Sequence, residues 1–249
     1  MEQHRVLKGY LFAAAGAALF STKAIFIKLA YMEQANAALL LALRMAVALP
    51  FFLAVGFYAL HQLRKAGKPL PGWGMAVRAL LAGFIGYYIS SLLDFEGLVY
   101  ITAQLERLVL GCALTFAVYQ LLAKNFITAM GSALFTSIAL SGSAVACIIH
   151  YIVTSRSFDF SSSPRFFWLA AGTGFFATVL PSFLVNAGLS RISPLSTSMI
   201  ATISPLITIS LAVWILGEPF TLVDALGSVM VIAGVGIYAL TDVKAKTAA

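Results

Sequence analysis

The chain contains few charged residues and almost no cysteine. Only 10% of its 249 residues are Asp, Glu, Lys or Arg, whereas soluble domains carry about 25%. This scarcity excludes an ordinary soluble globule, and it also excludes a disordered chain, which needs high charge and low hydrophobicity. Cys112 and Cys147 both lie inside apolar runs, so the sequence indicates neither a disulfide framework nor a cysteine-based zinc site.

Motifs of enzyme active sites are also missing. The sequence has no His-Glu-x-x-His, no Gly-x-Ser-x-Gly and no Walker loop. Gly172-Thr173-Gly174 lacks the preceding strand that a dinucleotide site requires. We therefore predict that the protein is not an enzyme and that it binds no cofactor and no metal.

Hydrophobic residues, in contrast, make up 61% of the chain. Because a helix needs about 20 mainly apolar residues to cross a lipid bilayer, we predict an all-α polytopic membrane protein with about eight transmembrane helices. These spans are residues 9–31, 37–60, 75–97, 108–127, 129–153, 166–187, 195–216 and 222–240. Pro50, Pro181 and Pro205 lie inside spans, where we expect kinks and no breaks, because neighbouring helices can satisfy the freed backbone groups.

The basic residues predict how the chain lies in the membrane. With a cytoplasmic N-terminus, ten Lys and Arg residues fall in cytoplasmic segments and four on the far side. The ten are Arg5, Lys8, Arg64, Lys65, Lys68, Arg78, Lys124, Arg191, Lys244 and Lys246. The positive-inside rule then predicts a multi-pass protein of the cell (inner) membrane with both termini in the cytoplasm. The same asymmetry explains the net charge of +7, so we predict no nucleic-acid partner.

The chain also contains a weak internal repeat. With a shift of 91 residues, two stretches align without gaps, and with a shift of 96 the first helix aligns with the fourth. The aligned pairs include Gly83-Phe84 with Gly174-Phe175, Gly97-Leu98 with Gly188-Leu189, Phe20 with Phe116 and Lys28 with Lys124. The two copies would begin in opposite orientations, which indicates the inverted repeat that is usual in secondary transporters.

The two copies are unequal in length. The second copy has five spans, whereas the first has three and the opening turns of a fourth, and the chain passes into the second copy at Leu110-Gly111. One fused helix through 103–127 would replace two helices of the same direction. We therefore predict a truncated first repeat over 1–110, a second repeat over 111–240 and a cytoplasmic tail over 241–249.

These features resemble the EamA-type branch of the drug/metabolite transporter superfamily. The stretches that carry the resemblance are Phe20-Ser21-Thr22-Lys23, Leu43-Arg44, Tyr100-Ile101-Thr102-Ala103, Ser193-Pro194-Leu195-Ser196, Ser204-Pro205, Leu216-Gly217-Glu218-Pro219 and Ala225-Leu226-Gly227. The resemblance implies ten helices in two inverted halves and a protein that exports or exchanges small metabolites. This chain departs from that plan at Leu110-Gly111, where part of the first half is missing.

Ionisable side chains inside the apolar core are candidates for function, because they are costly to insert. Lys23 and Arg44 each lie about 12 Å from the outer end of their helices. At this depth the Lys23 ammonium does not easily reach the outer membrane–water interface. Both can bind an anionic substrate, although Arg44 can instead pair with an acidic neighbour. Asp94 and Glu96, near the outer end of the third span, are proton-coupling candidates or structural partners of nearby arginines.

Polar side chains in otherwise apolar helices complete the predicted substrate site. Tyr119 and Gln120 lie on the fourth span, and Ser198 and Thr202 share one face of the seventh. Hydrogen bonding between helices is the alternative role for these groups.

The sequence therefore favours a secondary transporter, an exporter or exchanger of a small polar or anionic metabolite across the inner membrane. Two alternatives remain. One is a vestigial or non-transporting membrane protein, and the other is a subunit whose homodimer completes the transport site with helices supplied in trans.

Overall fold

The computed structural model describes residues 2–33, 36–93, 110–155 and 163–247. All regular structure in these ranges is helical. The elements in chain order are α1 (Glu2–Tyr31), α2 (Ala37–Lys65), α3 (Trp73–Gly83), η1 (Phe84–Ile89), α5 (Leu110–Met130), α6 (Ser132–Thr154), α7 (Pro164–Gly174), η3 (Phe175–Val179), α8 (Leu180–Leu189), α9 (Pro194–Ala201), α10 (Ser204–Leu211), η4 (Ala212–Leu216) and α11 (Leu222–Thr247). The elements labelled η are π-helical.

The predicted all-α polytopic membrane fold is confirmed. Among the described residues, six helical stretches are long and apolar enough to cross a bilayer, and α5 and α11 lie at the fourth and eighth predicted spans. The six are His4–Tyr31, Ala37–Lys65, Trp73–Leu93, Ser132–Thr154, Pro164–Leu189 and Pro194–Leu216. The predicted fused helix is described only from Leu110 onward, because 103–109 lies outside the described residues.

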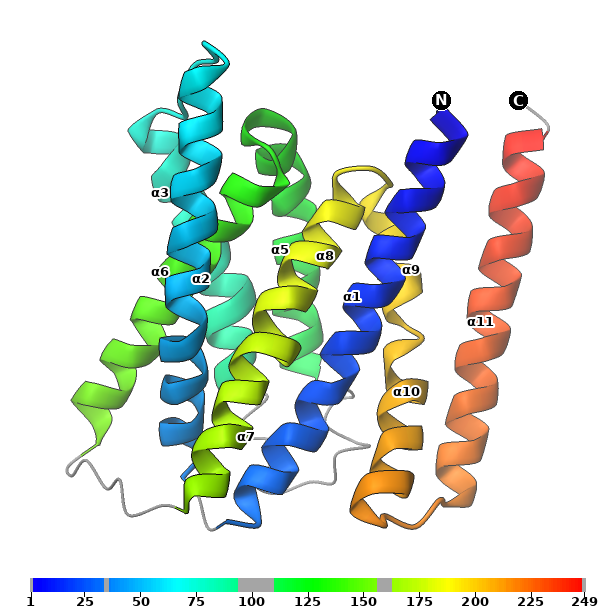
Figure 1. The fold of residues 1–249 in the computed structure, drawn as a ribbon. Coiled ribbons are helices and arrows are strands. Elements are labelled where there is room, and N and C mark those ends of the chain that lie inside the picture. The colour runs from blue at the N-terminus through cyan, green and yellow to red at the C-terminus, as the bar shows by residue number, and fades with distance from the viewer. Residues whose placement is uncertain (1, 34–35, 94–109, 156–162, 248–249) are drawn as a thin grey trace.

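The helices run in the directions that an inverted repeat requires. Figure 1 shows α1 descending from the end of the bundle that holds both termini, whereas α5 ascends toward that end. In the same way α2 ascends and α6 descends, and the third helix of each half again runs opposite to its counterpart. Both ends of the chain therefore lie on one side of the bundle, as an even number of crossings demands.

Two of the three described π-helical segments repeat at the spacing found in the sequence. The segment η1 begins at Phe84, directly after Gly83, and η3 begins at Phe175, directly after Gly174. Such segments are rare inside α-helices and frequently lie at functional sites. Their recurrence 91 residues apart shows that the third helices of the two halves share a local backbone feature.

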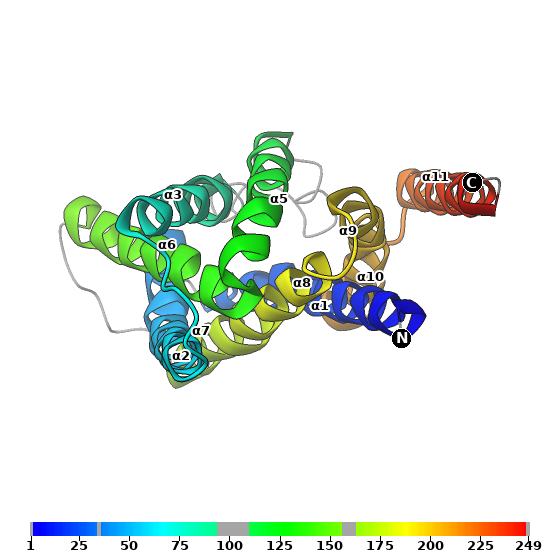
Figure 2. The same cartoon turned by 90° about the horizontal axis from the view of Figure 1, so that it is seen from above.

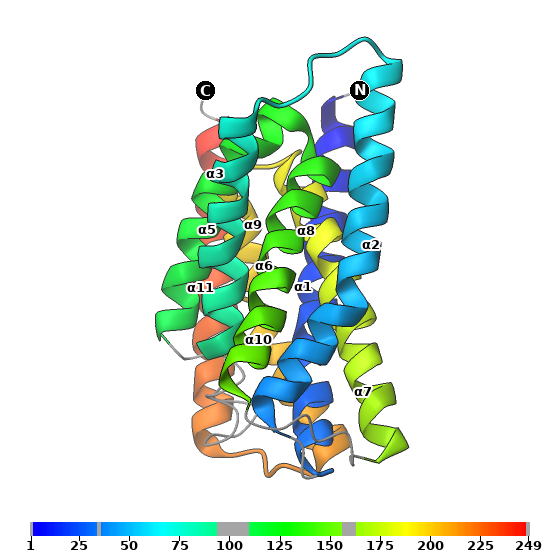
Figure 3. The same cartoon turned by 90° about the vertical axis from the view of Figure 1, so that its left-hand side faces the viewer.

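The two halves are interlocked and do not form separate bundles. The helix α3 packs against α6 and α5 of the other half (Figure 3), while α7 and α8 pack against α2 and α1. The pair α2 and α6 forms the central contact between the halves. Small residues allow this closeness: a Cβ atom on Gly16 would lie 2.9 Å from the backbone nitrogen of Val185 on α8.

The three prolines inside spans do not behave alike. Pro50 lies within the continuous helix α2, and Pro181 lies within the continuous stretch Pro164–Leu189. At Pro205 the stretch Pro194–Leu216 is distorted but remains one span, as expected for a kink: Thr202 and Ile203 form a turn between α9 and α10, and both keep right-handed helical backbone angles. Proline has no N–H to donate to the carbonyl four residues earlier, and the Ile203 N–H bonds to Ile200 three residues back.

The last helix stands at the edge of the bundle. Figure 2 shows α11 beside α10 and away from the remaining helices. Its apolar residues are largely uncovered, with Leu222 77% exposed and Met230 74% exposed. A bilayer or another protein surface must therefore surround most of this helix.

Candidate functional site

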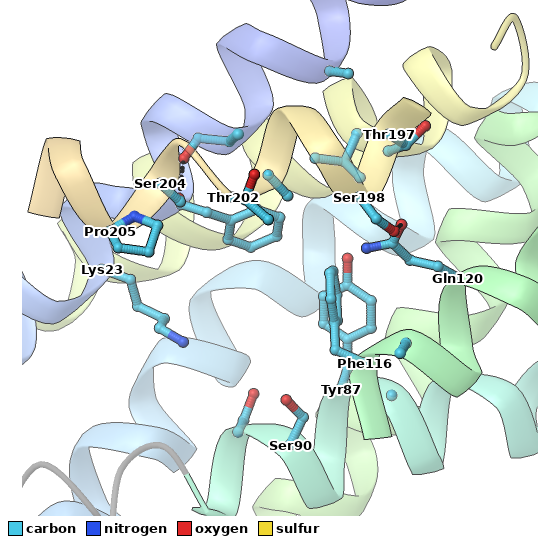
Figure 4. A pocket seen from close by; sticks show the side chains of 18 of the residues that line it. Lys23, Tyr87, Ser90, Phe116, Gln120, Thr197, Ser198, Thr202, Ser204 and Pro205 are labelled. Carbon is cyan, nitrogen blue, oxygen red and sulfur yellow. Dashed lines mark hydrogen bonds between the residues drawn. The ribbon is translucent and has the colours of Figure 1, made fainter. Parts of the chain in front are cut away.

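A cavity of about 390 Å³ lies between the two halves. Its walls come from α1, α2, the stretch Trp73–Leu93, α5, η3, α8, α9, α10 and α11 (Figure 4). Five of the six residues predicted to bind substrate line it, namely Lys23, Arg44, Gln120, Ser198 and Thr202. The fold thus brings together side chains that are up to 179 positions apart in the sequence.

One end of the cavity is cationic. Lys23 is 8% exposed and Arg44 is 2% exposed, and the Nη2 atom of Arg44 donates a hydrogen bond of 2.7 Å to the Ser91 hydroxyl. In Figure 4 the Lys23 ammonium and the Ser90 hydroxyl point into the same open space. Cations held in such a low-dielectric place attract an anion far more strongly than surface cations do.

The other end presents an uncharged amide. Gln120 on α5 is 4% exposed, and its Oε1 atom accepts a hydrogen bond of 3.0 Å from the Ser198 hydroxyl on α9. Thr202 lies at the break between α9 and α10 and also lines the cavity. The bond between Gln120 and Ser198 therefore joins the fourth and seventh predicted spans across the wall of the cavity.

Tyr119, the sixth predicted residue, lies behind this wall and does not line the cavity. Its side chain is fully buried, and its hydroxyl accepts a hydrogen bond of 2.8 Å from the Asn186 amide. Asn186 also donates to the Thr136 hydroxyl, at 2.9 Å. Tyr119 thus belongs to a buried polar network that links α5, α6 and α8.

The aromatic lining residues were not predicted as site residues: they are Phe20, Phe116 and Tyr87. The rings of Phe20 and Phe116 meet edge to face with 6.4 Å between centroids, and Tyr87 meets Phe116 at 6.1 Å. One indication of the contact between Phe20 and Phe116 was available in the sequence, because a shift of 96 residues aligns them. If a pseudo-two-fold axis relates the two halves, it also relates Phe20 to Phe116. Two residues related in this way lie close together when both are near the axis.

Hydroxyl groups fix α1 to the broken helix. The Ser21 and Ser204 hydroxyls lie 2.7 Å apart, so one donates to the other, and both lie within hydrogen-bond distance of the carbonyl oxygen of Ala17, at 2.8 and 2.9 Å. The Thr208 hydroxyl donates to the Ser21 carbonyl at 3.3 Å. These bonds hold the start of α10 against α1 just beside the cavity.

The proton-coupling candidates lie outside the described residues. Asp94 and Glu96 both belong to the segment 94–109. Their role stays a prediction from the sequence.

A comparison with known protein families gives a match. The model of the EamA-like transporter family matches residues 106–240, which is more than half of the chain. The match begins near Leu110-Gly111 and ends inside α11. No curated protein matches the chain.

Proposed function

We propose that this chain, which belongs to the EamA-like transporter family, is a secondary transporter that exports or exchanges a small polar or anionic metabolite. The observation that carries the proposal is the placement of Lys23 and Arg44 in one cavity between two inverted halves. Among the described lining residues, these two cations are the charged side chains. An anionic group that enters the cavity would exchange its hydration for charge-assisted hydrogen bonds.

The interlocked halves suggest how access to the cavity would alternate. Transporters with inverted repeats move one half against the other around a central site, and broken helices often line that site. Here the break between α9 and α10 lies at Thr202, which lines the cavity. We infer that α9 and α10 pivot at this turn while α2 and α6 keep their central contact.

We place the transporter in the inner membrane with both termini in the cytoplasm. The excess of Lys and Arg on one side supports this orientation, and the common location of the two termini fits it (Figure 1). A proton carried by Asp94 or Glu96 would couple substrate movement to the proton gradient.

We also propose that the transporter acts as a homodimer, and the exposed glycines of α11 favour this arrangement. Glycines inside the bundle, such as Gly86 and Gly188, lie against neighbouring helices. At Gly227 and Gly234 on α11, by contrast, an added Cβ atom would meet nothing within 4 Å. Small residues let membrane helices approach closely, so we propose that α11 of a second copy packs here and completes the transport unit.

The test is transport by the purified full chain in proteoliposomes. Vesicles loaded with a mixture of labelled organic acids should release the substrate on dilution, faster than protein-free vesicles do. Lys23→Gln should lower this flux strongly, whereas Lys28→Gln, which changes a residue outside the cavity lining, should leave it nearly unchanged. Flux that is unaffected by Lys23→Gln would remove the site, and no flux of any acid would remove the function.

A further inference from the structure

The orientation of one amide group in the cavity constrains what the cavity can bind. Because the Ser198 hydroxyl donates to Oε1 of Gln120, the Nε2 group of the same amide is turned away from α9. Figure 4 shows this nitrogen directed into the open space. Within the described part of the chain, no group accepts a hydrogen bond from it, although Gln120 is 4% exposed.

A donor that faces a cavity can be satisfied by a ligand or by water, and a ligand that displaces water there must supply an acceptor to avoid leaving the donor unpaired. Figure 4 shows donors at two ends of the cavity, the Lys23 ammonium at one and the Gln120 amide at the other. Arg44 also lines the cavity and bonds to Ser91, the neighbour of Ser90 at the Lys23 end. The two ends differ in charge. A carboxylate or phosphate suits the cationic end. An uncharged oxygen acceptor suits the amide, because the described lining residues near Gln120 supply no counter-charge for a second full charge.

The wall between the two ends is aromatic. Phe20, Phe116 and Tyr87 line the cavity and contact one another at 6.1–6.4 Å between centroids. Such rings favour a flat or apolar body and offer little to a chain that is polar throughout.

We propose that the substrate is an organic monoanion with an apolar body and an uncharged oxygen acceptor, such as a ketone or ester carbonyl, at the end remote from its acidic group. Gln120 selects this remote end by donating from Nε2, and Ser198 is the positioning residue that holds the amide in the required orientation. The inference rests on the proposed transport function and narrows its substrate class. It also excludes a remote ammonium group, for which the Gln120 nitrogen would be a repulsive neighbour.

Three probes of nearly equal shape test the proposal: 4-acetylbenzoate, 4-isopropylbenzoate and 4-(1-aminoethyl)benzoate. They carry a carbonyl, no polar group and an ammonium, respectively, at the same position. Calorimetric titration of the full chain in detergent should show the ketone bound roughly threefold to tenfold more tightly than the isopropyl compound, as expected for one hydrogen bond. The ammonium compound should bind most weakly.

Variants separate selection by the amide from general damage to the site. Gln120→Met keeps the size of the side chain and should abolish the preference for the ketone while the isopropyl compound binds as before. Gln120→Glu should reverse the order and favour the ammonium compound. Ser198→Ala should reduce the preference for the ketone, because the amide can then turn its oxygen toward the ligand.

Tyr119→Phe is the matched control, since Tyr119 precedes Gln120 but does not line the cavity. It should lower thermal stability through the lost bond to Asn186 and leave the order of the three probes unchanged. A ketone preference that survives Gln120→Met would overturn the proposal, as would equal binding of all three probes to the wild type. If none of the probes binds while other acids are transported, the substrate class is wrong and the transport function stands.

Discussion

Gly83 and Gly174 make equivalent contacts in the two halves of the molecule. A Cβ atom on Gly83 would overlap the carbonyl oxygen of Ala139 on α6, and one on Gly174 would lie 2.8 Å from the carbonyl oxygen of Arg44 on α2. The two glycines are 91 residues apart and their two partners are 95 residues apart. Each half therefore inserts its third helix against the second helix of the other half at the same point.

We expect Gly83→Leu and Gly174→Leu to destabilise the protein strongly. Overpacking a close contact typically costs about 1–3 kcal/mol, and here backbone atoms, which cannot turn aside, are the neighbours. Unfolding followed by circular dichroism in detergent measures the effect. Gly227→Ala, which adds a methyl group in open space, should leave stability unchanged or raise it slightly. Equal behaviour of all three variants would argue against interlocked halves.

Anion binding at the cationic end of the cavity should depend on the shape of the Arg44 guanidinium as well as on its charge. Its guanidinium donates to Ser91 at 2.7 Å, and a lysine in its place could not keep this bond and bind an anion in the same fork-like geometry. We expect Arg44→Lys to weaken binding of the transported anion about tenfold. Equilibrium binding to protein in detergent measures this, and Arg78→Lys, at an exposed position of α3 outside the cavity lining, serves as the control.

The sequence predicted the membrane class, the spans and the inverted repeat because each depends on hydrophobicity and order along the chain. The predicted span 129–153 corresponds to α6 (Ser132–Thr154), and 166–187 corresponds to Pro164–Leu189. Neighbouring residues were harder to assign. Tyr119 and Gln120 are about 100° apart on a helix, and only the packing of α5 against η1 and α9 decides that Gln120 faces the cavity.

The two-residue turn at Thr202 and Ile203, which is the form that the kink at Pro205 takes, could not be predicted for a similar reason. Proline in a membrane helix is compatible with a kink or a break, depending on what satisfies the freed backbone groups. Here the side chain of Ser204 bonds to α1, and this contact between residues 183 positions apart is invisible in a local sequence pattern. The shared contact of Phe20 and Phe116 was accessible only through the repeat.

Ser21 and Ser204 should show measurable energetic coupling. Their hydroxyls lie 2.7 Å apart and are buried between α1 and α10, and hydrogen bonds between membrane helices contribute about 0.6 kcal/mol on average. A double-mutant cycle with Ser21→Ala and Ser204→Ala, measured by unfolding in detergent, should give a coupling of about this size. Ser210→Ala, whose hydroxyl bonds only within its own helix to Leu206, should show no coupling with Ser21→Ala.

Pro205→Ala should restore an N–H group at the break and favour a continuous helix through α9 and α10. If the turn at Thr202 and Ile203 is the pivot of α9 and α10, the variant should bind substrate normally but transport it more slowly. Parallel measurements of binding in detergent and flux in proteoliposomes separate these effects. Pro50→Ala, in the unbroken helix α2, should leave the ratio of flux to binding unchanged, and the same result for Pro205→Ala would exclude a pivot there.

The open glycines of α11 give the last prediction, which concerns the transport unit. Gly227→Leu and Gly234→Leu place bulky side chains where the molecule itself offers no contact, so the fold of one chain should tolerate both. If a second copy packs against this face, the variants should convert dimers to monomers, because leucine side chains prevent the close approach that glycine allows. Photobleaching of single fluorescent labels in liposomes counts the chains in each unit. A wild type that bleaches in one step, with full transport activity, would show that one chain is sufficient and that lipid alone covers α11.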